Sequence, residues 1–254
     1  MDLFLRSVSL LVLIFGGPAL ALWARARWGR PAAWLGIGAF IFTGAQGVRL
    51  PLLAGLSWLF QRGWLPHPSD PLTFNLMVLS VSAGLFEETA RWLGMRWARR
   101  RQERIGLDLG ERDVLVLGLA HGGAEAFWLG LIGWIQLIAM TMIRESLLPT
   151  PPGAEAAVAA YWNAPAWLPL VGILERGMAI GIHIGLAFLV WLGVRRSQLA
   201  LWGAAVLLHA LVNGTAVYAM ARWGVWAAEG VVALWALISA WGVKRIRARA
   251  ADSR

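Results

Sequence analysis

The chain contains no cysteine and little charge of either sign. The missing cysteine excludes a disulfide framework, a thiolate nucleophile, Cys-ligated zinc and an iron–sulfur cluster. Charged residues make up 15% of the 254 residues and apolar residues 59%, whereas soluble domains average about 25% charged residues and about 45–50% apolar ones. The composition therefore predicts an integral membrane protein and excludes an ordinary soluble domain, a disordered tail and a fibrous protein.

Lysine is also nearly absent, since 22 of the 23 basic residues are arginine. A formal net charge of +9 is compatible with nucleic-acid binding. The basic residues, however, lie in short clusters beside apolar runs, and membrane proteins use such clusters to set their orientation. We therefore expect lipid as a partner and no nucleic acid. The lack of a lysine inside any apolar run argues against a retinal protein.

Seven apolar runs predict an all-α, polytopic membrane helical bundle that forms a single integral membrane domain over residues 1–254. The runs cover residues 3–24, 32–48, 72–97, 114–143, 166–194, 199–220 and 225–243. Pro51 follows the second run and predicts a kink, or a short interfacial helix over residues 52–60. The stretch 144–165 contains four prolines and is predicted to be the longest loop.

The positive charges divide unequally between alternate loops. One side, made up of residues 25–30, 96–112, 195–196 and 244–254, holds 16 basic residues, and the other side holds five. Positive residues concentrate on the cytoplasmic side. The pattern therefore predicts a bacterial-type cytoplasmic-membrane protein with its N-terminus outside and its C-terminus in the cytoplasm.

The first apolar run has two interpretations. Residues 18–21 (Pro-Ala-Leu-Ala) resemble the small-residue cleavage region of a signal peptide. Arg25, Arg27 and Arg30 directly follow the run and look like the flank of a retained span. The arginines favour the retained span.

Polar and ionisable side chains interrupt the later runs. A charged or imidazole group inside a bilayer costs a few kcal/mol or more, so each is a functional-site candidate. At about 1.5 Å of rise per residue, the first glutamate and the three histidines each lie roughly 12–16 Å from the predicted cytoplasmic end of their helix. This shared depth predicts one site, in the cytoplasmic half of the membrane. The candidates are Glu87, Glu88, Arg91, His121, Glu125, Glu175, Arg176, His183, His209 and Asn213.

The spacing of these residues predicts one polar stripe on each helix. Arg91 lies four residues after Glu87 and three after Glu88, so it can reach either acid. His121 with Glu125, and likewise the last histidine with the asparagine, are four residues apart. The glycines at 122 and 123 allow close approach of another helix or of a substrate strand, although small residues also mark plain helix packing.

Carboxylates beside imidazoles are suited to activating water. A glutamate can accept a proton, and imidazoles can hold water, stabilise an oxyanion or bind a metal. His121, His183 and His209 with a carboxylate could complete a tetrahedral site. His-x-x-x-Glu differs from the familiar zinc signature His-Glu-x-x-His. The expected cofactor is therefore either none or a divalent metal such as Zn²⁺.

A known family shows the same motifs in the same order. They are Glu87-Glu88-x-x-Arg91, His121-Gly-Gly-x-Glu125-Ala, Glu175-Arg176 with His183, and His209-x-x-x-Asn213, within about residues 72–220. This pattern resembles the YhfC family, which is grouped with the CAAX-protease and bacteriocin-processing superfamily of intramembrane proteases.

The resemblance implies hydrolysis of a peptide or membrane-protein substrate. By position it implies that Glu87 is the general base, that His121 and His209 lie beside the water, and that Asn213 lies near the oxyanion. One residue fewer separates the acids from Arg91 than in the wider superfamily, so Glu88 stays an alternative base. The family is named for metalloproteases, but a glutamate–histidine mechanism needs no metal. The roles of His183 and Glu125 within the catalytic group stay open.

Other interpretations of the same residues remain. The acids and Arg91 can form a structural ion pair, and Glu175 and Arg176 are expected to make separate structural contacts, because adjacent residues point about 100° apart. A proton-coupled carrier or ligand-binding membrane protein could use the same glutamate–histidine network as a relay. A haem protein with two axial histidines is disfavoured by the surrounding carboxylates.

Overall fold

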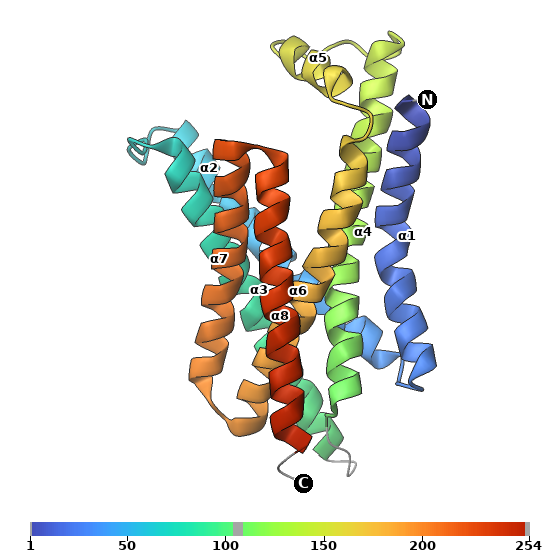
Figure 1. The fold of residues 1–254 in the computed structure, drawn as a ribbon. Helices are drawn as coiled ribbons and strands as arrows, with labels where there is room; N and C mark the ends of the chain where they lie inside the picture. The colour runs from blue at the N-terminus through green and yellow to red at the C-terminus, as the bar shows by residue number, and fades with distance from the viewer. Residues whose placement is uncertain (1, 104–108, 252–254) are drawn as a thin grey trace.

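A computed structural model describes residues 2–103 and 109–251 of the chain. Within these ranges the chain folds into eight α-helices and no strand. The N-terminal end of α1 and the C-terminal end of α8 lie at opposite ends of an elongated bundle (Figure 1). The helices are α1 (Asp2–Arg27), α2 (Ala33–Gln61), α3 (Pro71–Glu103), α4 (Glu111–Arg144), α5 (Glu155–Asn163), α6 (Leu168–Arg196), α7 (Leu199–Trp223) and α8 (Val225–Ala251).

The predicted all-α membrane bundle is confirmed. Among the described helices, six are long and apolar enough to cross a membrane: α1, α2, α4, α6, α7 and α8. Helix α3 is 33 residues long but more polar, because it carries the acidic and basic residues singled out in the sequence. The seventh crossing and the side on which each terminus lies stay predictions.

Of the two alternatives expected at Pro51, the separate interfacial helix is wrong, because α2 continues through this proline to Gln61. A proline inside a helix removes a single N–H donor, and membrane helices tolerate this loss where neighbouring groups compensate. The stretch 144–165 is not loop throughout, since it contains α5. Alanines at several positions of α5 account for this helix, because alanine has the highest helix propensity.

Helix α3 begins with a capped turn. Asp70 precedes Pro71, a residue suited to the first helical position because its fixed φ and missing N–H fit there. The Asp70 carboxylate accepts a hydrogen bond from the Thr73 backbone N–H at 3.1 Å. Hydrogen bonds from the Thr73 side chain and backbone lower the pKa of Asp70. The cap fixes where α3 starts and therefore which residues α3 places deep in the bundle.

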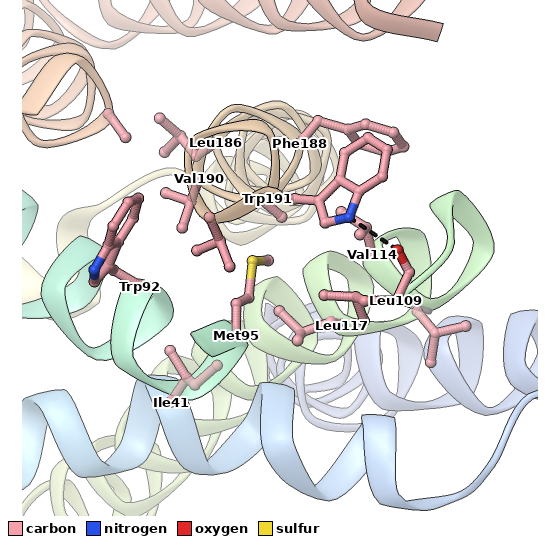
Figure 2. Packing of buried hydrophobic residues seen from close by; sticks show 14 of the residues in the cluster. Ile41, Trp92, Met95, Leu109, Val114, Leu117, Leu186, Phe188, Val190 and Trp191 are labelled. Atoms are coloured by element: carbon pink, nitrogen blue, oxygen red, sulfur yellow. Dashed lines mark hydrogen bonds between the residues drawn. The ribbon is translucent and has the colours of Figure 1, made fainter. Parts of the chain in front are cut away.

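The buried apolar core lies where α3, α4 and α6 meet (Figure 2). Met95 of α3 and Leu117 of α4 pack there with Phe188 of α6, all fully buried. The Trp191 indole N–H donates to the Leu109 carbonyl at 3.0 Å and ties α6 to the segment before α4. Dense packing of this kind holds membrane helices together, since lipid provides no hydrophobic drive for their association. The core thereby fixes the three helices against each other next to their polar residues.

Glycines bring neighbouring helices into backbone contact. A Cβ atom added at Gly17 of α1 would lie 2.8 Å from the Gly123 Cα atom of α4, and one added at Gly122 would lie 3.0 Å from the Ile180 Cα atom of α6. Helix α1 accordingly runs alongside α4 (Figure 1). The Gly122-Gly123 pair therefore serves helix packing, and the packing of α1 supports its interpretation as a retained span.

We expect Gly17→Ala to lower the free energy of unfolding by about 1–3 kcal/mol, because the added methyl group forces α1 and α4 apart. The matched control is Gly16→Ala on the same helix, whose added Cβ would meet only the Val12 side chain, at 3.7 Å. Thermal unfolding of both variants in the same detergent measures the difference. Equal midpoints would contradict the close packing of these helices.

Candidate functional site

Side chains from four helices meet in a buried polar centre beside the apolar core. Glu87 and Glu88 come from α3, His121 from α4, His183 from α6 and His209 from α7, and all five are buried. The structure thus brings together the glutamates and histidines that the sequence places at one depth. Their catalytic roles are not tested by this arrangement.

Arg91 pairs with Glu88 and not with Glu87. Its Nη1 atom lies 2.8 Å from Glu88 Oε1 and 2.7 Å from Glu88 Oε2, and both side chains are fully buried. Residues three apart on a helix face the same side, so α3 alone forms this pair. His209 adds a contact from α7, with Nδ1 2.8 Å from Glu88 Oε1. Because the carboxylate paired with Arg91 accepts, His209 Nδ1 carries the proton and donates it.

The same guanidinium fixes the tautomer of His183. Arg91 Nη2 lies 3.0 Å from His183 Nδ1, and an arginine can only donate. His183 Nδ1 therefore accepts, and the ring proton of neutral His183 is on Nε2. This Nε2 lies 2.8 Å from Glu125 Oε2, to which it donates. Both ring nitrogens of His183 are thus engaged.

Glu87 has a different environment. Its Oε1 accepts from the Gln46 side-chain amide at 2.9 Å, and its Oε2 lies 3.1 Å from His121 Nε2. His209 Nε2 is 3.9 Å from the same Oε2. Among the described residues, no arginine lies within ion-pair distance of Glu87. Glu87 is therefore the glutamate whose carboxylate is left without an arginine.

The tautomer of His121 follows from burial. Its Nδ1 is buried and has no hydrogen-bond partner in the described part of the chain. A buried N–H without a partner costs more than a buried lone pair, because a donor loses its only interaction. His121 therefore carries its proton on Nε2 and donates it to Glu87. The ring packs edge-on against Phe42, with the centroids 5.5 Å apart.

Arg176 connects the site to the outer part of the bundle. Its Nη1 lies 3.0 Å from Glu125 Oε1, and its Nη2 forms an ion pair with Glu175. The expectation of separate contacts for Glu175 and Arg176 is wrong, because the long, flexible side chain of Arg176 reaches around the helix to Glu175. Exposure of the side chain rises from 5% at His183 to 21% at Glu125 and 37% at Glu175. Polar contacts therefore run from the buried centre outward.

Asn213 stays outside the polar network. It lies one helical turn beyond His209 on α7 and is half-buried, and its side chain makes no hydrogen bond to any residue that the structure describes. Its neighbour Gly214 faces Ser80 of α3, since a Cβ added there would lie 3.5 Å from Ser80 Oγ. The predicted role of Asn213 at the oxyanion stays a prediction.

Sequence reasoning missed two residues of α2. Gln46 contacts Glu87, and Arg49 Nη1 donates to the Gln46 carbonyl oxygen at 3.0 Å. The available signal was an amide inside an apolar run, followed three residues later by an arginine. Amides and arginines are also common at span ends, so the signal alone does not distinguish a site residue from a boundary.

The arrangement does not fit a bound metal ion as it stands. Atoms of Glu87, His121 and His183 that could act as ligands all lie within 4.8 Å of one another, whereas the sequence suggested three histidines that included His209. A metal at this cluster needs a free nitrogen on His183. Arg91 and Glu125 occupy both of its nitrogens, so one of these contacts would have to break.

These features define a class: a polytopic membrane protein whose helices enclose acid–base side chains. A model of the YhfC intramembrane metalloprotease family matches residues 8–236, so the chain belongs to the YhfC family. It is also 30% identical over 152 residues to the uncharacterized membrane protein YhfC of Bacillus subtilis (strain 168). That alignment spans about half of each chain, 54% of both. No solved structure matches the chain.

We expect Arg91→Met to lower the free energy of unfolding by about 3–5 kcal/mol, because it leaves Glu88 as a buried charge without its arginine. The double variant Arg91→Met/Glu88→Gln should recover part of this loss. Arg62→Met, at an exposed position after α2, is the control and should change little. Unfolding in detergent measures all three, and a double variant no more stable than Arg91→Met would show that Arg91 does not compensate Glu88.

Proposed function

We propose that the protein is an intramembrane peptidase in which Glu87 activates the attacking water. The observation that carries this proposal is the contrast between two adjacent glutamates. Glu88 is held by Arg91 and His209, whereas Glu87 is held by the neutral donors Gln46 and His121. The carboxylate that no arginine neutralises is the better proton acceptor of the two. The family description supports the reaction class.

The charges of the centre support a role for His209 beside Glu87. Arg91 balances Glu88, whereas Arg49 lies beyond the Gln46 amide, so an ionised Glu87 has no positive charge in direct contact. A second proton on His209 supplies that charge, with Nδ1–H directed at Glu88 and Nε2–H toward the Glu87 side, where Oε2 is 3.9 Å away. Balanced charge is favoured in the membrane interior, because uncompensated charge is costly there.

The proposed reaction uses these groups in order. Glu87 removes a proton from water, and the resulting hydroxide adds to the carbonyl carbon of the substrate peptide bond. The carbonyl oxygen becomes an oxyanion, which the His209 Nε2–H group stabilises by a hydrogen bond. The carbon–nitrogen bond then breaks, and the proton held by Glu87 passes to the leaving amine. His121 keeps the carboxyl group of Glu87 oriented throughout.

A proton-coupled carrier is the second candidate, supported by the chain of polar contacts from Glu88 to Glu175. Relay of protons along this chain must pass Arg91, which lies between Glu88 and His183. A guanidinium does not give up its proton in proteins. This interruption favours the peptidase over the carrier.

Substitution of Glu87 tests the proposed reaction. We expect Glu87→Gln to lower the cleavage rate of membrane-segment peptides by roughly 10²–10⁴-fold, because the amide cannot take the proton of water. Glu145→Gln, at an exposed position beyond the end of α4, is the control and should cleave at the wild-type rate. If the wild type cleaves no peptide while Glu87→Gln abolishes pH-dependent uptake into vesicles, the protein is a carrier.

Metal removal tests the donor arrangement at His183. Because both nitrogens of this ring are engaged, we expect the purified protein to hold well under one equivalent of transition metal and to keep its activity after dialysis against a chelator. Elemental analysis before and after dialysis, with cleavage assays on both samples, makes the measurement. Stoichiometric metal whose removal and return abolish and restore cleavage would contradict this expectation.

A further inference from the structure

Gln46 contacts the proposed base from a helix that carries none of the family motifs, and Arg49 holds Gln46 in place. Both residues lie on α2 and are half-buried, and the Gln46 amide bonds the Oε1 atom of Glu87, whereas the imidazoles approach Oε2. We propose that Gln46 and Arg49 form a clamp that positions the carboxylate of Glu87. The inference rests on the proposed function and adds a positioning device to it.

The orientation of the Gln46 amide follows from its two partners. Arg49 Nη1 lies 3.0 Å from Gln46 Oε1. An arginine can only donate, so the carbonyl end of the amide must face Arg49. The NH₂ group then faces Glu87 Oε1 at 2.9 Å. Glu87 Oε1 is therefore the acceptor of this hydrogen bond, which fixes that end of the carboxylate.

Arg49 is itself anchored to the helix that carries Glu87. Its Nε donates to the Ser82 hydroxyl at 3.0 Å, and its Nη2 donates to the Leu79 carbonyl at 2.9 Å. Both partners lie on α3, within about two to three turns of Glu87. The clamp therefore joins α2 to α3 at two places and fixes the carboxylate against its own helix.

The clamp has a chemical consequence for Glu87. With Oε1 held by the Gln46 amide, Oε2 is directed at the imidazoles and lies 3.1 Å from His121 Nε2 and 3.9 Å from His209 Nε2. The base thus works on the side where the imidazoles can hold the water and the oxyanion. Because the Gln46 amide is neutral, it orients the Glu87 carboxylate without neutralising it. The direct contact with Arg91, by contrast, neutralises Glu88. Gln46 separates the Arg49 charge from the base.

Gln46→Leu tests the clamp by removing the donor to Glu87. We expect kcat to fall roughly 10–100-fold with KM within about twofold of the wild type, because a misplaced base slows the reaction more than it weakens binding. Gln61→Leu is the matched control, since Gln61 lies on the same helix, is exposed, and its side chain bonds Ser57 and no other described residue. A kcat equal to that of the wild type, or a change confined to KM, would overturn the proposal.

Gln46→Glu separates positioning from a merely structural role. At low pH the introduced carboxyl group is protonated and can donate to Glu87, as the amide does. At higher pH it is ionised and repels Glu87. We therefore expect cleavage close to the wild-type rate at low pH and a reversible loss as the pH rises, in one and the same folded protein. A pH profile parallel to that of the wild type would overturn the clamp.

An infrared measurement separates failure of the clamp from failure of the proposed function. The band that disappears in Glu87→Gln is assigned to the Glu87 carboxyl group. The clamp predicts that this band shifts in Gln46→Leu and stays in place in Gln61→Leu, whether or not any peptide is cleaved. A wild type that cleaves nothing would refute the peptidase, and an unshifted band in Gln46→Leu would refute the clamp.

Discussion

The buried ion pair between Arg91 and Glu88 organises the polar centre. Its two side chains are fully buried, and further hydrogen bonds help to offset the cost of burying such a pair. His209 and His183 provide two of these contacts, from α7 and α6, and the Arg91 Nε atom has no partner among the described residues. The pair therefore fixes two histidines as well as itself. By engaging Glu88, Arg91 also leaves Glu87 as the acid held by neutral donors.

Rigid helix packing keeps these contacts in place. Glycines let α1 and α6 approach α4 at backbone distance, and the apolar core of Met95, Leu117 and Phe188 joins α3, α4 and α6 beside the polar centre. A site built on packed helices holds its geometry better than one built on loops. The hydrogen bonds around Glu87 are therefore properties of the fold and do not depend on one flexible segment.

The sequence predicted the membrane bundle, its family and the residues that meet in the centre, because polar groups inside apolar runs are costly and their depth follows from helical rise. It left open which glutamate Arg91 holds, since spacing allows both. It also missed Gln46 and α5 and misjudged Arg176. Each of these depends on helix rotation, side-chain reach or local propensity outside the spans, which the apolar pattern does not contain.

The most direct test of the account is a solid-state NMR distance between the guanidinium nitrogens of Arg91 and the side-chain carboxyl carbons of the two glutamates, measured in lipid bilayers. Glu87→Gln and Glu88→Gln assign the two carboxyl signals. The account predicts a direct contact from Arg91 to Glu88 and none to Glu87. A direct contact to Glu87 would contradict it, because the proposed base would then be the acid that the arginine neutralises.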